Sequence, residues 1–172
     1  MVRLWKKANW TEVACRIPAL IEKVGGIFLI TGKEGQSNIM TIGWAQTGRV
    51  WGRPMATVLV RPSRFTFEKL KEHPFFVIAL PTEDMYSAIQ LCGSVSGREG
   101  NKFQKAGLST RHHQDFPVPS IEECVGALFC QVIQETKVDP ATFPQHIIQE
   151  YYPQGDFHHI YFGEIIKAEL KT

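Results

Sequence analysis

Two polar stretches next to predicted strands constrain this chain most. The pattern of residues 37–44 predicts a β-strand that carries amide, hydroxyl and indole groups. Residues 60–66 run from the end of a second predicted strand, through an Arg-Pro pair, into the start of a helix. Together, the two stretches predict a socket for a flat, phosphorylated ligand.

The second stretch contains a strand-to-helix junction. Residues 57–60 are β-branched or apolar and predict a short strand, and the apolar spacing over 65–72 predicts a helix. We expect this helix to open between residues 62 and 65, because proline suits a first helical turn and Ser63 is a common N-cap type. Unpaired backbone amides at a helix start carry partial positive charge, so this end favours an anion.

Arg61 and Arg64 flank the predicted helix start. A guanidinium group is the side chain best shaped for forked contact with phosphate. The alternative is an ordinary capped helix with two solvated arginines, and composition alone favours that alternative. The anion hypothesis therefore needs support from other parts of the chain.

Length and charge exclude several classes of protein. With 172 residues, 44% of them hydrophobic, the chain suits one domain over residues 1–172. A net charge of +2 does not indicate binding to nucleic acid or to an anionic membrane. We expect no membrane span and a cytoplasmic location. Cys15, Cys92, Cys124 and Cys130 have no metal-ligand spacing, so we interpret them as reduced thiols.

Many short strands and few helices predict a mainly β fold, a barrel or sandwich with helical excursions. The expected strands cover residues 27–31, 38–46, 55–60, 75–80, 127–138 and 157–170, and Gly163 is expected at a bulge or close approach. Helices are expected near 63–72, 82–90 and 102–106. Residues 48–54 are expected to form a loop, 109–119 to cross the surface, and 139–155 to form a proline-punctuated excursion.

Motif-based catalytic and metal sites find little support. Residues 26–33 lack P-loop spacing, and the centre of the 93–97 segment is Val95, so it is not a nucleophile elbow. The adjacent histidine pairs 112–113 and 158–159 are poor metal ligands, because neighbours on a strand face opposite ways. The Gly/Ser loop 93–97 with Lys102 could approach an anion, although a solvated turn is the simpler interpretation.

Taken together, several segments resemble the flavin reductase-like family of FMN-binding split-barrel proteins, and the flavoredoxin branch is the most similar. These segments are 38–44, 60–66, 76–81, 92–98, 101–103 and 162–165, and the resemblance covers about residues 24–170. It implies a six-stranded split β-barrel of Greek-key type, a homodimer, and one FMN per subunit near the subunit interface.

The resemblance also assigns residues to the cofactor. The isoalloxazine and ribityl chain would contact Asn38, Met40, Thr41 and Trp44, and the phosphate would lie near Arg61, Ser63, Arg64 and Thr66. The cofactor would be surrounded by Ser94, Val95, Ser96 and Gly97. Lys102 would reach the phosphate or the ring edge, and His158 would stand beside the flavin. The excursion over 139–155 is longer than this family leads us to expect, which leaves His158 or His159 open for that position. Gly43 and Gln46 leave the ring-side wall, and hence substrate preference, open.

The family implies hydride transfer from NADH or NADPH to the flavin N5, in which the cofactors supply the chemistry and the protein supplies position and charge. No catalytic protein nucleophile or base is expected. The main hypothesis is an NAD(P)H-dependent FMN reductase. One alternative is an FMN-containing electron carrier without a nicotinamide site, and another is a β-barrel interaction module that has lost flavin.

Overall fold

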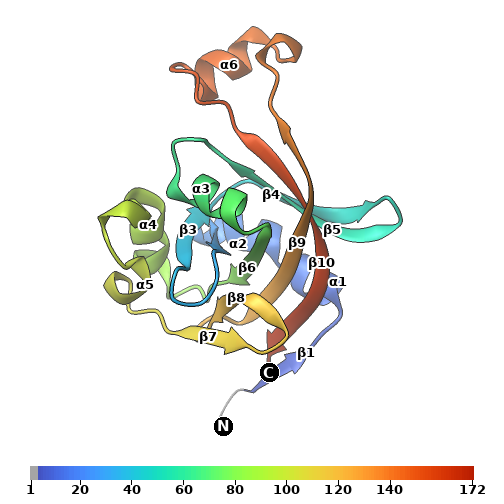
Figure 1. Cartoon of the computed structure of the whole chain (residues 1–172), viewed down its shortest axis with the longest axis vertical. Coiled ribbons are helices and arrows are strands. Elements are labelled where there is room, and N and C mark those ends of the chain that lie inside the picture. The colour runs from blue at the N-terminus through green and yellow to red at the C-terminus, as the bar shows by residue number, and fades with distance from the viewer. Residues whose placement is uncertain (1–3) are drawn as a thin grey trace.

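A curled antiparallel sheet of eight strands organises the protein (Figure 1). The computed structural model describes residues 4–172. The sheet follows the order β3 (Asn38–Ile42), β2 (Ile27–Thr31), β6 (Phe75–Leu80), β9 (Gly126–Lys137), β10 (His159–Lys171), β5 (Arg53–Val60) and β4 (Ala45–Val50), and β1 (Trp5–Lys7) pairs with the end of β10.

The remaining elements surround this sheet. They are the helices α1 (Trp10–Ala14), α2 (Ile17–Val24), α3 (Phe65–Glu72), α4 (Tyr86–Ser94), α5 (Lys102–Lys105) and α6 (Gln145–Tyr151), the 3-10 turns η1 (Gly97–Glu99) and η2 (Pro140–Thr142), and the hairpin of β7 (Thr110–His113) and β8 (Phe116–Ile121). Figure 1 shows α6 beyond the far ends of β9 and β10, away from the chain termini. No helix in the described part of the chain is long and apolar enough to cross a membrane.

The sheet has a hydrophobic core on each face. In β2, Leu29 packs with Ile78 in one core, while Phe28 packs with Val77 in the other, because successive side chains of a strand point to opposite faces. All five residues of β2 are therefore buried. This explains why β2 and β6 are continuous apolar runs, and it confirms the strands expected over 27–31 and 75–80.

The expected six-stranded split β-barrel is wrong in strand number, and the sheet does not close into a barrel. The described chain has ten strands, and the sheet ends at β3 and β4, which do not pair with each other. These two strands are consecutive in sequence and joined only by Gly43 and Trp44, so the link carries the chain from one end of the sheet to the other. The single strand expected over 38–46 is therefore also wrong, since it is broken after Ile42.

The loop expected over 48–54 is instead a tight hairpin between β4 and β5. Val50 pairs with Arg53, and the two turn residues, Trp51 and Gly52, have φ values of 52° and 73°. Positive φ at both central positions suits the right-handed twist of the flanking strands. Tryptophan is an unusual residue in such a turn, which is why the sequence pattern did not indicate it.

Gly163 confirms the expected close approach in the last strand. The β10–β9 register shifts between Phe162 and Gly163, and a Cβ at Gly163 would lie 2.5 Å from the ring of Phe76. A side chain has no space at this position, so the bulge and the glycine occur together.

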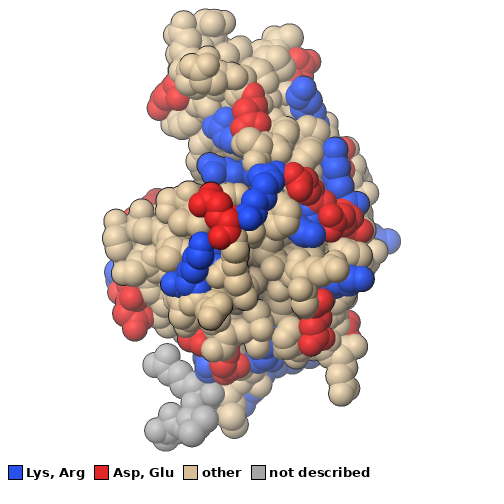
Figure 2. Space-filling view, turned by 60° about the vertical axis from the view of Figure 1, so that its left-hand side comes forward, with Lys and Arg blue, Asp and Glu red and all other residues tan. Residues whose placement is uncertain are grey.

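Charged side chains are mixed on the face of the molecule shown in Figure 2. Lysine and arginine alternate there with aspartate and glutamate, and no continuous basic surface forms on that face. This distribution agrees with the small net charge of +2.

Candidate functional site

Two adjoining pockets open at the gap between β3 and β4. The first, here called the aromatic pocket, has a volume of about 200 Å³ and is lined by Met40, Thr41, Ile42, Gly43, Trp44, Leu59, Arg61, Arg64 and His158. The second, the polar pocket, has a volume of about 120 Å³ and is lined by Asn38, Met40, Ser63, Arg64, Phe65, Thr66, Gly93, Ser94, Val95, Ser96, Gly97, Glu99 and Lys102. Met40 and Arg64 line both, so the two pockets form one continuous site.

All fourteen residues that the sequence assigned to the site line one of these two pockets. They come from β3 and the link after it, the junction after β5 with the start of α3, the end of α4 with the loop that follows it, the start of α5 and the residue before β10. The fold thus brings together segments that are up to about 120 residues apart in the sequence.

Rings form one wall of the aromatic pocket. The ring centroids of Trp44 and His158 are 4.9 Å apart, and Trp44 is 40% exposed whereas His158 is 8% exposed. The Tyr152 hydroxyl lies 2.8 Å from His158 Nδ1. Burial, assisted by the charge of Arg61, lowers the pKa of His158 to about 4. The imidazole is therefore neutral near pH 7.

His158 and His159 lie in different surroundings. His158 lines the aromatic pocket, whereas the His159 ring bonds to the carboxylate of Glu135 at 2.5 Å and packs on Phe67. The two residues point to different environments because they are adjacent in an extended segment.

A strap, defined here as residues 139–157, closes one side of the site. The Arg61 guanidinium donates to the backbone oxygens of Tyr151 and Asp156, at 2.7 and 3.2 Å. The carboxylate of Asp156 accepts bonds from the Ser63 amide and hydroxyl at 3.2 and 2.6 Å. The strap thus occupies donors of Arg61 and Ser63, two residues that the resemblance assigned to phosphate.

The start of α3 differs from the expectation that Ser63 would cap it. The helix begins at Phe65, its N-cap residue is Arg64, and no side chain caps it. Ser63 stands one residue before the N-cap position, and its hydroxyl donates to the carboxylate of Asp156. In the described chain, the Arg64 guanidinium forms no hydrogen bond or ion pair. An uncapped helix start beside an unpaired guanidinium is suited to an anion.

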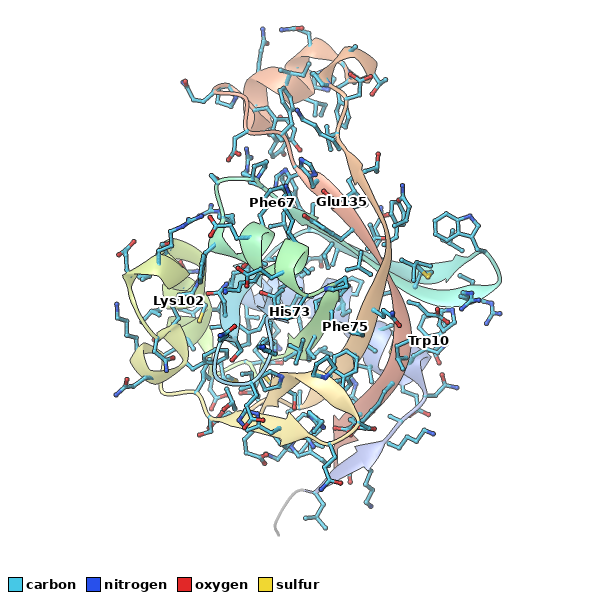
Figure 3. The ribbon with its side chains drawn as sticks, in the orientation of Figure 1. Trp10, Phe67, His73, Phe75, Lys102 and Glu135 are labelled. Carbon is cyan, nitrogen blue, oxygen red and sulfur yellow. The ribbon has the colours of Figure 1, made fainter. Side chains whose placement is uncertain are left out.

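Lys102 is the first residue of α5 and lies next to α4 (Figure 3), and it lines the polar pocket together with the loop over residues 93–97. It is 5% exposed, and its ammonium donates to the backbone oxygens of Cys92 and Val95, both at 3.0 Å. Burial lowers its pKa. An ammonium group has three N–H donors, so one remains after these two bonds. Lys102 therefore anchors the loop and keeps one donor for a ligand.

Close packing fixes the loop against β3. The Asn38 amide donates to the Thr66 hydroxyl at 2.9 Å, and both residues are buried. A Cβ at Gly97 would lie 2.1 Å from Asn38 Oδ1, so only glycine fits between this amide and Phe65. The Ser96 hydroxyl accepts a bond from the Arg98 amide. The loop over residues 93–97 is consequently held in place where Gly97 meets Asn38.

Two other predicted residues direct their hydroxyl protons into the protein. Thr41 Oγ1 donates to the backbone oxygen of Ile89 at 2.6 Å, and Ser94 Oγ donates to that of Gln90 at 2.8 Å. Both oxygens keep lone pairs, so toward a ligand they can act as acceptors.

Sequence reasoning missed several lining residues. Ile42, Leu59, Phe65, Gly93 and Glu99 line the pockets but were not assigned. Most of them stand inside or beside the stretches that were singled out, so the local pattern could have indicated them. Glu99 differs from the other four residues, because its negative charge would repel an anion in the polar pocket.

Comparisons with known proteins agree with this geometry. Residues 24–172 match the sequence family described as the flavin reductase like domain. An uncharacterized protein of Archaeoglobus fulgidus is 30% identical over 67% of this chain, and the matched region spans 64% of that relative.

Solved structures share the fold. A flavoredoxin from Methanosarcina acetivorans has a TM-score of 0.63 and 26% identity, over 83% of this chain and 67% of that one. An FMN-binding domain of a flavin reductases-like enzyme from Shewanella baltica has a TM-score of 0.68 and 19% identity, over 99% of this chain and 78% of that one.

Proposed function

Since the chain belongs to the flavin reductase like family, we propose that it binds FMN across the two pockets and reduces it with a nicotinamide. The observation that carries this proposal is the convergence of all fourteen assigned residues on one continuous site. The flavin ring would occupy the aromatic pocket and the phosphate the polar pocket.

The polar pocket has the chemistry that a phosphate requires. Arg64 would supply a guanidinium, Lys102 its third ammonium proton, and the start of α3 its free amides. Arg61 and Ser63 would act indirectly, by holding the strap, because that is where their donors point. Glu99 would have to turn toward solvent for the phosphate to enter.

Bound FMN would supply hydride acceptance from NADH or NADPH. The chain would hold the ring against Trp44 and His158, and Trp44, which is 40% exposed, leaves room for a second planar group. Positioning of this kind requires no protein nucleophile, in agreement with the expectation of no catalytic side chain. The cytoplasm, where reduced nicotinamides are abundant, is the location that fits this role.

The runner-up is an FMN-containing electron carrier that receives electrons from a partner protein. The likeness to a flavoredoxin at 26% identity favours it. In that case the exposed edge of Trp44 would face a redox partner instead of a nicotinamide.

We also propose a homodimer formed through the outer face of β4, β5 and β10. A groove of about 510 Å³ on this face is lined by Leu59, Ile160 and Phe162 among others, and it shares Gly43 and Trp44 with the aromatic pocket. A second copy seated there would cover apolar surface and lie beside the flavin. Light scattering should give twice the monomer mass of 19.5 kDa, and Phe162→Glu should shift the protein to monomer.

The decisive experiment is anaerobic mixing of the FMN-saturated protein with NADH, and separately with NADPH, while the flavin absorption is followed. Rapid bleaching at micromolar to millimolar nicotinamide, the usual enzyme range, would establish the reductase and its donor. No bleaching, with dithionite still reducing the flavin, would overturn the reductase in favour of the carrier. A protein that binds no FMN would overturn both and leave the interaction module.

A further inference from the structure

The strap has a single buried residue, Tyr152, which is 5% exposed. Its ring packs on Phe157, with centroids 4.8 Å apart, and lies under the Arg61 guanidinium, whose carbon is 4.9 Å from the ring centroid. Packing alone would be satisfied by phenylalanine. The hydroxyl needs a separate explanation, because it is placed 2.8 Å from His158 Nδ1.

The direction of this hydrogen bond follows from the partners available. Among the described side chains, only that of His158, through Nδ1, hydrogen-bonds to the Tyr152 hydroxyl. If the hydroxyl only accepted, its own proton would be buried without a partner, which costs about 1–3 kcal/mol. We therefore assign Tyr152 as the donor and Nδ1 as the acceptor. Burial lowers the pKa of His158 to about 4, so the neutral ring carries its one proton on Nε2.

The Nε2 proton is available to a ligand. No described residue accepts a bond from Nε2, and the atom is not sealed from solvent. His158 lines the aromatic pocket together with Trp44, whose half-exposed ring packs against the imidazole at a tilt of 49°, with the ring centroids 4.9 Å apart. A donor beside an aromatic face suits a planar molecule with an acceptor oxygen at its edge.

We propose that Tyr152 is a positioning residue that holds the His158 imidazole with Nε2–H as a donor in the aromatic pocket, so that the pocket selects flat ligands carrying a carbonyl-type oxygen. The ligand class rests on the function proposed above, because such a ligand would stack over the flavin. The protonation state assigned to His158 does not rest on that function, because it follows from the contacts of the chain itself.

The first test is nitrogen NMR of the protein labelled in histidine, without added flavin. In the wild type, the His158 signals should show a protonated Nε2 and a hydrogen-bonded, unprotonated Nδ1. Tyr152→Phe keeps the ring and should shift the Nδ1 signal to that of an unbonded nitrogen. The matched control is Tyr151→Phe, which removes the neighbouring hydroxyl on the same strap and should leave the His158 signals unchanged. A proton on Nδ1 in the wild type, or an unchanged Nδ1 signal in Tyr152→Phe, would overturn the proposal.

The second test measures ligand preference in the FMN-saturated protein. Benzaldehyde should bind at least about fivefold more tightly than toluene, which has a similar shape and no acceptor, since one hydrogen bond is worth about 1 kcal/mol. Tyr152→Phe should reduce this ratio severalfold. Equal affinity for the two probes in the wild type would overturn the assigned ligand class. Failure to bind FMN would count against the proposed function alone, because the NMR result stands without it.

Discussion

Gly97→Ala offers the sharpest test of the loop that closes the polar pocket. The new Cβ would lie 2.1 Å from Asn38 Oδ1 and 2.7 Å from Phe65 Cδ1, whereas real Cβ contacts essentially never fall below 3.0 Å. Asn38 or the loop must therefore move by about 1 Å. Movement of Asn38 would break its 2.9 Å bond to Thr66, which is buried.

The magnitude follows from two contributions. Overpacking costs about 1–3 kcal/mol, and a buried hydrogen-bonding group that loses its partner costs about 1–3 kcal/mol. If Asn38 moves, the free energy of unfolding falls by about 2–6 kcal/mol. If the loop moves instead, the donors of the polar pocket are displaced, and FMN affinity falls by about tenfold for each 1.4 kcal/mol lost.

Urea unfolding and FMN titration by fluorescence separate these two outcomes. The matched control is Gly48→Ala in β4, because no atom lies within 4 Å of a Cβ built there and its φ is not in the left-handed region. This control should stay within about 1 kcal/mol and twofold of wild type. The packing argument fails if Gly97→Ala matches the control in both unfolding free energy and FMN affinity.

Further predictions concern stability and reactivity. Burial lowers the pKa values of His113 and His158 to about 4 from the ordinary 6.5. The free energy of unfolding should therefore be unaffected by these histidines above pH 6.5 and should fall by about 3 kcal/mol for each as the pH falls toward 4, because the unfolded chain then binds protons that the folded chain does not. Urea midpoints that do not change between pH 7 and 4 would contradict this. In native protein, N-ethylmaleimide should modify Cys15 and spare the three buried cysteines, and mass spectrometry should find more than one adduct only after denaturation. Gly163→Ala should lower the unfolding free energy by about 1–3 kcal/mol, because its Cβ would meet the Phe76 ring at 2.5 Å; an unchanged melting temperature would refute the close approach.

The sequence predicts the parts of the fold that local chemistry determines. The apolar runs of β2 and β6 are buried on both faces, and such runs identify strands regardless of their neighbours. The residues assigned to the cofactor came from the family resemblance, and the local pattern alone pointed only to the helix start near Arg61 and Arg64 and to the loop 93–97 with Lys102. These segments lie at strand ends and glycine-containing turns, where binding residues are often found.

The errors occur where distant contacts decide the structure. Residues 109–119 were expected to cross the surface because the segment is polar and interrupted by Pro117 and Pro119. They instead form the hairpin of β7 and β8, a separate two-stranded sheet with free edges, where proline removes no essential ladder bond. The break after Ile42 separates β3 from β4, which lie at opposite ends of the sheet, and this arrangement depends on pairings with strands distant in sequence.

The role of the strap was also beyond local inference. Its partners Arg61 and Ser63 lie 90 or more residues earlier in the chain. A proline-punctuated segment signals an irregular excursion, but it carries no information about which surface the excursion contacts. The local sequence therefore does not indicate that the Tyr152 hydroxyl contacts His158.

The single buried side chain of the strap has a consequence for how the protein opens. A segment with so little buried surface separates from the body at a cost well below global unfolding, so residues 139–157 form a unit that undocks locally. Its attachments to Arg61 and Ser63 stand at the rim of the two pockets. A molecule bound in the aromatic pocket, against Trp44 and His158, would hold the strap down, and the rate at which a protease cuts α6 would then report how much of the site is occupied.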